Sequence, residues 1–194
     1  MSNTIDYYNA NATGFMQGTA KVDISLIHSE FLRCIPKNGA ILDFGCGSGR
    51  DTKAFLELGY EVDAIDGSEE LCKLASKHTG INVRHMLFQE LNEIEKYDGI
   101  WACASVLHLD RVQLHTVLNK MCDALKKNGI IYVSFKYGMF EGERNGRYFT
   151  DFTEDTFTSF LAGIHTLKLE KQWITNDARP DRGEEKWLNI ILRK

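Results

Sequence analysis

The sequence has little of what marks several large classes of protein. Its five cysteines are odd in number and widely spaced, and none stands in a C-x-x-C pair, which argues against a zinc site or a disulfide framework. No apolar run approaches the length needed to cross a bilayer, and the polar residues 1–11 do not have the pattern of a signal peptide. A formal net charge of -4 does not favour non-specific binding to duplex nucleic acid. We therefore expect one cytoplasmic domain, residues 1–194, that needs no metal and no membrane.

The most informative segment is residues 40–50, which read AILDFGCGSGR. An apolar run, typical of a buried parallel strand, is followed at once by alternating glycines. Such glycines let the chain turn sharply and let a ligand lie against bare peptide. The helical pattern that begins near Arg50 would direct free N–H groups toward that ligand. We expect a cofactor to bind this loop at Gly45, Cys46, Gly47, Gly49 and Arg50.

The spacing of the glycines differs from that of the dinucleotide fingerprint, because the third glycine comes one residue too early. Asp43, just before the glycines, would repel a pyrophosphate but attract an ammonium group. A second predicted strand ends at Asp66, about 20 residues farther on, where a carboxylate can hydrogen-bond a ribose diol. Gly67 and Ser68 follow directly and complete this turn. The glycine loop, the ammonium partner and the ribose partner together indicate S-adenosylmethionine.

At these residues the sequence resembles the class I S-adenosylmethionine-dependent methyltransferases. The resemblance runs from about Ile35 to Phe135 and has four motifs in order: ILDFGCGSG at 41–49, VDAIDGS at 62–68, YDGIWACASVLH at 97–108 and LKKNGII at 125–131. Within the class, the chain is similar to small bacterial tellurite-resistance methyltransferases, whose core also resembles eukaryotic wobble-uridine tRNA methyltransferases. The resemblance implies an α/β, Rossmann-like fold: a seven-stranded, mostly parallel sheet, helices on both faces and an antiparallel C-terminal hairpin.

Alternating strand and helix patterns agree with that fold. Strands are expected at 40–44, 60–66, 81–87, 99–104, 130–135, 165–174 and 186–192. Helices are expected at 22–34, from 50 to about 58, after Ser68, from Asp110 through Leu125 to an end at Gly129, and at 153–161. We expect residues 136–151, which are glycine-rich and charged, to form a long loop on the substrate side. By resemblance, residues 1–34 form a mobile lid and a helix, with a disordered polar tail as the alternative for the first residues.

The resemblance also suggests which residues line the rest of the cofactor site. The acidic residue that usually follows the third strand would fall at Leu87, so this usual contact with adenine is missing. Phe88 or Gln89 is expected to line the adenine pocket instead, by stacking or by hydrogen bonding. A plain core position for Phe88 is the alternative. Beside the methionine part of the cofactor, the resemblance places Ala102 or Cys103.

His108 is the first candidate for a catalytic role. It follows the fourth predicted strand, at the edge where open α/β sheets bind ligands. With an ordinary pKa of about 6.5, a histidine there can act as a general base; a histidine bonded only to backbone is the alternative. Tyr137 is a second catalytic candidate.

Substrate binding is expected at Tyr8 in the lid and at three cations after the fifth predicted strand, Lys136, Arg144 and Arg147. The two arginines would hold an anionic substrate through bidentate hydrogen bonds. A solvated loop whose positive charges are balanced by nearby glutamates is the alternative.

The sequence has only two prolines, and neither lies in a Pro-Pro-aromatic motif of amino-methylating DNA enzymes or a Pro-Cys nucleophile for cytosine methylation. We therefore expect an S-adenosylmethionine-dependent methyltransferase that acts on a small-molecule acceptor, a metabolite or an oxyanion, by in-line transfer. A tRNA wobble-uridine-type methyltransferase is the alternative within this class. A nicotinamide-dependent oxidoreductase and a non-catalytic cofactor-binding subunit are the alternatives from other classes.

Overall fold

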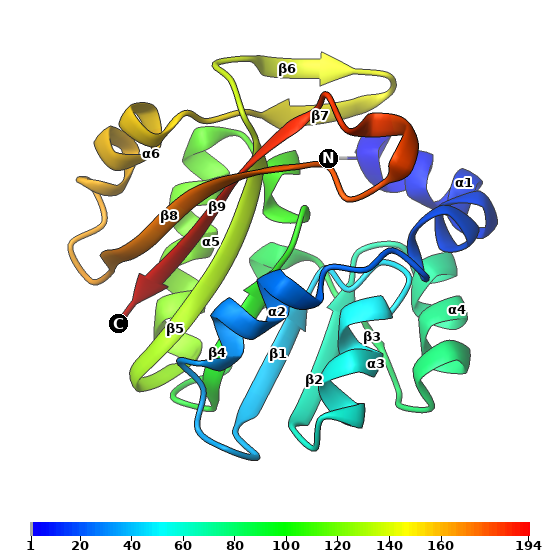
Figure 1. Cartoon of the computed structure of the whole chain (residues 1–194), viewed down its shortest axis with the longest axis horizontal. Helices are drawn as coiled ribbons and strands as arrows, with labels where there is room; N and C mark the ends of the chain where they lie inside the picture. The colour runs from blue at the N-terminus through cyan, green and yellow to red at the C-terminus, as the bar shows by residue number, and fades with distance from the viewer. Residues whose placement is uncertain (1) are drawn as a thin grey trace.

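A computed structural model describes residues 2–194, and its centre is a seven-stranded sheet of order β3-β2-β1-β4-β5-β9-β8 (Figure 1). The parallel strands are β1 (Ala40–Phe44), β2 (Glu61–Asp66), β3 (Arg84–His85), β4 (Tyr97–Ala102) and β5 (Leu125–Lys136). At one edge, β9 (Lys186–Arg193) is antiparallel to β5, and β8 (Lys168–Asn176) is antiparallel to β9. The predicted α/β fold with an antiparallel C-terminal hairpin is confirmed.

Helices cover both faces of the sheet, because successive strand residues point to opposite sides. On one face, Phe31 of α2 (Ser25–Leu32) and Phe55 of α3 (Arg50–Glu57) pack around Trp101. On the other face, the sheet is covered by α5 (Arg111–Ala124) and α6 (Glu154–Leu161). α4 (Glu69–Thr79) packs its buried stripe against Ala64 of β2. Since both faces are buried, the central strands read as nearly continuous apolar runs.

Two further segments lie across the carboxyl end of the parallel strands (Figure 1). One is α1 (Ser2–Thr19), and the other is a separate hairpin of β6 (Glu141–Arg144) and β7 (Arg147–Thr150). The Tyr148 N–H donates to Thr4 Oγ1 at 3.1 Å and ties the hairpin to α1. Ser68 Oγ donates to Asn9 Oδ1 at 2.7 Å and ties α1 to the start of α4. The amino-terminal helix is therefore docked over the end of the sheet where ligands bind in such folds.

The expectation of a long loop at residues 136–151 was wrong, because this segment contains β6 and β7. The turn between them is formed by Asn145 and Gly146, with φ angles of 50° and 75°. Two successive residues with positive φ are the backbone of a type I′ hairpin turn, for which Asn-Gly is a preferred sequence. The charged composition concealed a two-residue signal that favours a hairpin.

Boundaries of other strands and helices also differ from expectation, and two of these differences have a clear structural reason. The third strand, expected at 81–87, is only Arg84–His85, because it lies at the sheet edge and pairs only with the end of β2. The long helix, expected to reach Leu125 and to end at Gly129, ends at Ala124. Leu125 instead has an extended backbone and pairs with Tyr97, so sheet pairing overrides the helical pattern there. No helix within residues 2–194 is long and apolar enough to cross a membrane.

We predict that Gly99→Ala destabilises the fold, because Gly99 of β4 lies directly beneath α2. A Cβ at this position would clash with Ile35 and come within 2.7 Å of Phe31 Cζ. Overpacking of this kind should lower the free energy of unfolding by about 1–3 kcal/mol, measured by urea denaturation. The control is Gly14→Ala in α1, where a Cβ would meet nothing within 4 Å and should leave stability unchanged or slightly raised. An unchanged midpoint for Gly99→Ala would contradict the close packing of α2.

Candidate active site

The loop after β1 is tied to the end of β2 by backbone hydrogen bonds. The N–H groups of Gly45 and Cys46 both donate to the Ile65 carbonyl at 2.9 Å. The Gly47 N–H donates to Asp66 Oδ2 at 2.8 Å. Gly45 has a φ of 87°, and a Cβ there would lie 2.5 Å from the Ser105 Cβ. Only glycine fits this position, so the loop has one well-defined path.

Asp66 lies in the cavity wall with both carboxylate oxygens held in place. Oδ2 accepts from Gly47, and Oδ1 accepts the Ser68 N–H at 2.8 Å. Burial raises the pKa of Asp66, while these backbone donors act in the opposite direction. Each carboxylate oxygen can accept a second hydrogen bond, so Asp66 keeps acceptor capacity for a diol.

Asp43 lies beneath the loop and does not line the cavity in the described part of the chain. It is buried and accepts a hydrogen bond from Thr52 Oγ1 at 2.5 Å. Burial, followed by the nearby Asp51 carboxylate, raises the pKa of Asp43. The raised pKa and the buried position both disfavour a negatively charged Asp43 that faces a ligand. A direct contact between Asp43 and an ammonium group stays a prediction.

A buried network fixes Arg50 at the cavity wall. Its Nε and Nη2 donate to the two oxygens of Asp51 at 2.7 and 2.9 Å. Asp51 also accepts from Trp101 Nε1 at 2.8 Å and bonds His28 Nε2 at 2.9 Å. Although burial of Asp51 works against ionisation, the Arg50 charge and the His28 hydrogen bond hold the pKa of Asp51 well below its usual range. Arg50 is thus a preorganised cation able to receive a carboxylate.

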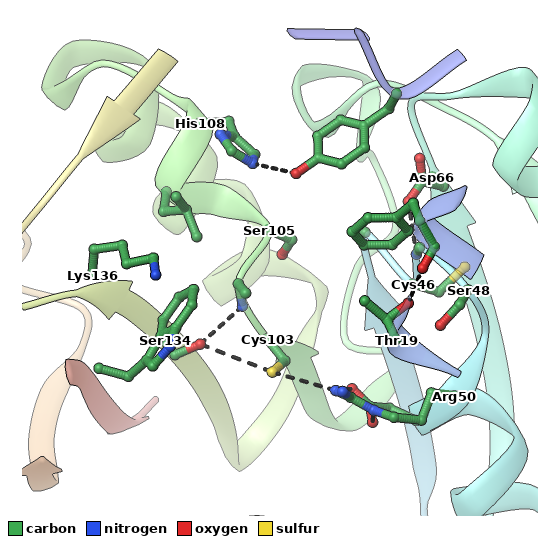
Figure 2. A pocket seen from close by; sticks show the side chains of 18 of the residues that line it. Thr19, Cys46, Ser48, Arg50, Asp66, Cys103, Ser105, His108, Ser134 and Lys136 are labelled. Carbon is green, nitrogen blue, oxygen red and sulfur yellow. Dashed lines mark hydrogen bonds and ion pairs between the residues drawn. The ribbon is translucent and has the colours of Figure 1, made fainter. Parts of the chain in front are cut away.

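The segment after β4, which contains Cys103 and Ser105, lines the cavity between Arg50 and His108 (Figure 2). The Ala104 N–H donates to Ser134 Oγ at 2.8 Å, and Ser105 Oγ donates to the Phe44 carbonyl at 2.6 Å. Cys103 lines the cavity, and burial raises the pKa of its thiol to about 12, so it stays protonated at neutral pH. These contacts leave a fixed, uncharged surface beside Arg50.

The other end of the cavity is lined by His108 (Figure 2). Tyr8 of α1 lines the same end. His108 Nδ1 lies 2.6 Å from the Tyr148 carbonyl, which can only accept, so Nδ1 carries the proton. Burial lowers the pKa of His108 to about 4, so the ring is neutral and its Nε2 accepts from the Tyr8 hydroxyl at 2.9 Å. His108 therefore has the backbone contact that the alternative foresaw, and a second contact to α1 as well.

The cations expected to bind substrate occupy different places. Lys136 lines the cavity and pairs with Glu185, and burial lowers its pKa to about 8. Arg147 also lines the cavity. Arg144 instead pairs with Asp151 at 2.6 Å and, with Tyr137, lines a neighbouring hollow. The structure does not bring Tyr137 or Arg144 to the main cavity.

Most of the residues named from the sequence line this one cavity: Tyr8, Gly45, Cys46, Gly47, Arg50, Asp66, Gly67, Ser68, Phe88, Cys103, His108, Lys136 and Arg147. Within residues 2–194, Asp43, Gly49, Gln89 and Ala102 do not line it. Sequence reasoning missed several residues that do: Thr4, Asp51, Ser134, Asp177, Arg179, Trp187 and Asn189. Asn189 had a signal, since it is a polar residue in an otherwise apolar strand. No three His, Cys, Asp or Glu side chains of the described chain are grouped so as to hold a metal ion.

Comparison with known proteins shows similarity to methyltransferases. Residues 41–129 match a family described as methyltransferase domain. An uncharacterized methyltransferase of Staphylococcus carnosus is 25% identical over 157 residues, which are 75% of this chain and 75% of that protein. The putative methyltransferase YqeM of Bacillus subtilis is 37% identical over 67 residues, 34% of this chain and only 27% of that protein.

Among solved structures, the fold is similar to that of a Burkholderia thailandensis 1,6-didemethyltoxoflavin-N1-methyltransferase with bound 1,6-didemethyltoxoflavin and S-adenosylhomocysteine. The TM-score is 0.76 at 24% sequence identity, and the match covers 98% of this chain and 84% of that chain. The fold is that of the class I methyltransferases. The family match and the methyltransferase relative support the same activity, so the chain is a methyltransferase with S-adenosylmethionine as its cofactor. The finer resemblance to tellurite-resistance enzymes stays a prediction.

We predict that Asp66→Ala weakens the binding of S-adenosylhomocysteine by about 1–3 kcal/mol, the range of hydrogen bonds to a charged group. Calorimetry on the folded variant measures this loss. The control is Asp63→Asn in the same strand, whose carboxylate bonds Lys96 and Tyr97 and does not line the cavity. A dissociation constant for Asp66→Ala equal to that of the native chain would rule out a ribose contact at this residue.

Proposed function

We propose that this methyltransferase acts on a small-molecule acceptor that is enclosed between α1, the β6–β7 hairpin and the sheet. The observation that carries the proposal is the hydrogen bond from Tyr8 of α1 to His108, because both residues line the cavity and the bond holds α1 against it. The Tyr148–Thr4 bond holds α1 against the hairpin as well. An acceptor must fit under this cover, which favours a small molecule over a folded nucleic acid. The named substrate of the structurally similar Burkholderia enzyme is also a small molecule.

The residues present fit the cofactor, because the glycine loop offers bare peptide and Asp66 keeps acceptor capacity. We assign Asp66 to the ribose, Phe88 to the adenine side and Arg50 to the carboxylate of the amino-acid part. When bound, S-adenosylmethionine supplies a methyl group on a positively charged sulfur. The protein has to align the acceptor with that methyl and exclude water. Docking of α1 over the cavity serves both tasks.

His108 is placed to hold the proton of an acceptor hydroxyl or ring N–H. Its Nδ1 proton is committed to the Tyr148 carbonyl, so Nε2 is the acceptor atom. In this structure Nε2 is occupied by Tyr8, so an acceptor reaches it by displacing that hydroxyl or by bonding to it. A neutral imidazole whose pKa is about 4 is a weak base. It orients the acceptor first and takes the proton only as the methyl group is transferred.

A screen with labelled methyl donor tests the proposed acceptor class. The enzyme is incubated with small-molecule extracts and, in parallel, with total tRNA, and the product fractions are counted. We expect label in the small-molecule fraction only. Label confined to tRNA would overturn the proposal in favour of the wobble-uridine alternative.

With an identified acceptor, we predict that His108→Gln lowers kcat by about 100-fold or more, the contribution of a positioned acid or base. Because the pKa of His108 lies near 4 rather than 6.5, kcat/KM should show no inflection near pH 6.5 from this residue. Tyr8→Phe, which removes only the hydroxyl from Nε2, is the matched variant and should retain more activity. A limb near pH 6.5 that disappears in His108→Gln would contradict the buried, neutral state of the ring.

A further inference from the structure

One cation in the cavity differs from all the others. Within residues 2–194, the other cationic side chains of the cavity wall have acidic partners: Arg50 with Asp51, Lys136 and Arg182 with Glu185, and Arg179 with Asp177. Among these described residues, Arg147 pairs with no carboxylate. Its Nε is buried and has no hydrogen-bond partner. Arg147 as a whole is half-buried, and a partly desolvated cation without a counter-ion is destabilising, so an anionic ligand would stabilise it.

Aromatic rings hold the Arg147 guanidinium in place. Its central carbon lies 4.5 Å from the Tyr7 ring centroid, 5.2 Å from that of Phe149 and 5.8 Å from that of Tyr8. The Nη1 group reaches the Tyr8 hydroxyl only at 3.4 Å. Rings fix the position of an arginine without using its N–H groups, so the Nη groups, rather than the shielded Nε, keep donor capacity for a ligand.

We propose that Arg147 binds an oxyanionic group of the acceptor, such as a carboxylate, next to the Tyr8–His108 pair. This assignment rests on the proposed function, because it places the acceptor at this end of the cavity. The planar guanidinium matches an oxyanion through two parallel hydrogen bonds. Tyr8 is close enough to the guanidinium to contact the same group. The acceptor is therefore a small organic acid, and its charged group determines how it is oriented toward the methyl donor.

The competing role for Arg147 is that of a latch, since its contacts to Tyr7 and Tyr8 also bind α1 to the hairpin. Two substitutions separate these roles. Arg147→Lys keeps the positive charge beside the rings but loses the fork, whereas Arg147→Gln loses both. A latch tolerates the lysine, while a bidentate anion site does not. Arg33→Gln removes one positive charge from the exposed surface of the protein, outside the cavity, and is the charge control.

The test uses the full chain saturated with S-adenosylhomocysteine and labelled with ¹⁵N-arginine. The Arg147 Nε–H resonance is identified by its loss in Arg147→Gln, and acetate, benzoate and inorganic phosphate are titrated at constant ionic strength. We expect a saturable shift with at least one of these anions, and none with benzamide, the neutral match of benzoate. Because Arg147→Lys lacks this resonance, the anion affinities of the native chain and of both variants are compared by calorimetry; affinity should fall at least about 10-fold in Arg147→Lys and stay unchanged in Arg33→Gln. No saturable shift, or equal affinity in Arg147→Lys, would overturn the anion site.

The anion titration involves no methyl transfer. A negative titration can therefore be distinguished from a negative result in the methylation screen that tests the proposed function. Anion binding without methylation of any small molecule leaves the site standing and defeats the proposed function. Methylation of neutral acceptors alone, without an anion response, defeats only the anion site. With an acidic acceptor from the screen, Arg147→Gln should raise KM by about 10- to 100-fold and leave kcat within a few-fold. A loss of kcat at unchanged KM would contradict a recognition role.

Discussion

The attachment of the glycine loop to the end of β2 is the constraint on which the rest of the site depends. The Ile65 carbonyl and the Asp66 carboxylate together hold three consecutive N–H groups of the loop. β1 lies between β2 and β4, where the strand order reverses and a crevice opens beyond the strand ends. Since Asp66 both fixes the loop and faces the cavity, the wall that we propose for the ribose forms as the sheet forms. The proposed cofactor site is therefore largely made before any ligand arrives.

The acceptor end is assembled differently. Tyr8 comes from α1, Arg147 from the hairpin and Trp187 from β9, and all three line the cavity. Much of the contact between them is polar or aromatic at the surface of the core, and surface elements of this kind open more readily than central strands. Movement of α1 would release Tyr8 from His108 and open the acceptor end, while the loop that holds the cofactor stays attached to β2. A rigid cofactor site and a removable cover would allow the proposed acceptor to exchange without loss of the fold.

Structural elements that are determined by neighbouring residues can be predicted from the sequence. The apolar run at 130–135 and the glycines after β1 carry their structure in a few neighbouring residues, and the structure confirms the first as strand and the second as a loop; the earlier start of β5 at Leu125 was missed. The β6–β7 hairpin was missed because its charged residues suggested a loop, although Asn145-Gly146 is a turn signal. The Tyr8–His108 contact could not be found in this way, since the two residues are 100 positions apart and neither belongs to a periodic pattern. The same holds for the bond between His28 and Asp51, which unites α2 with the start of α3.

Charge is distributed unevenly along the cavity, and this bears on how transfer proceeds. At the cofactor end, Arg50 and Asp51 neutralise each other within a buried network. At the proposed acceptor end, Arg147 pairs with no carboxylate of residues 2–194, and its Nε has no hydrogen-bond partner among them. Methyl transfer removes the positive charge of the sulfonium. A cavity that excludes water therefore favours the transfer when the attacking atom is electron-rich. An arginine bonded to the attacking atom would oppose this by withdrawing its electron density. The oxyanion held by Arg147 must therefore be a group other than the one methylated, which leaves the neighbourhood of His108 Nε2 for the reacting atom.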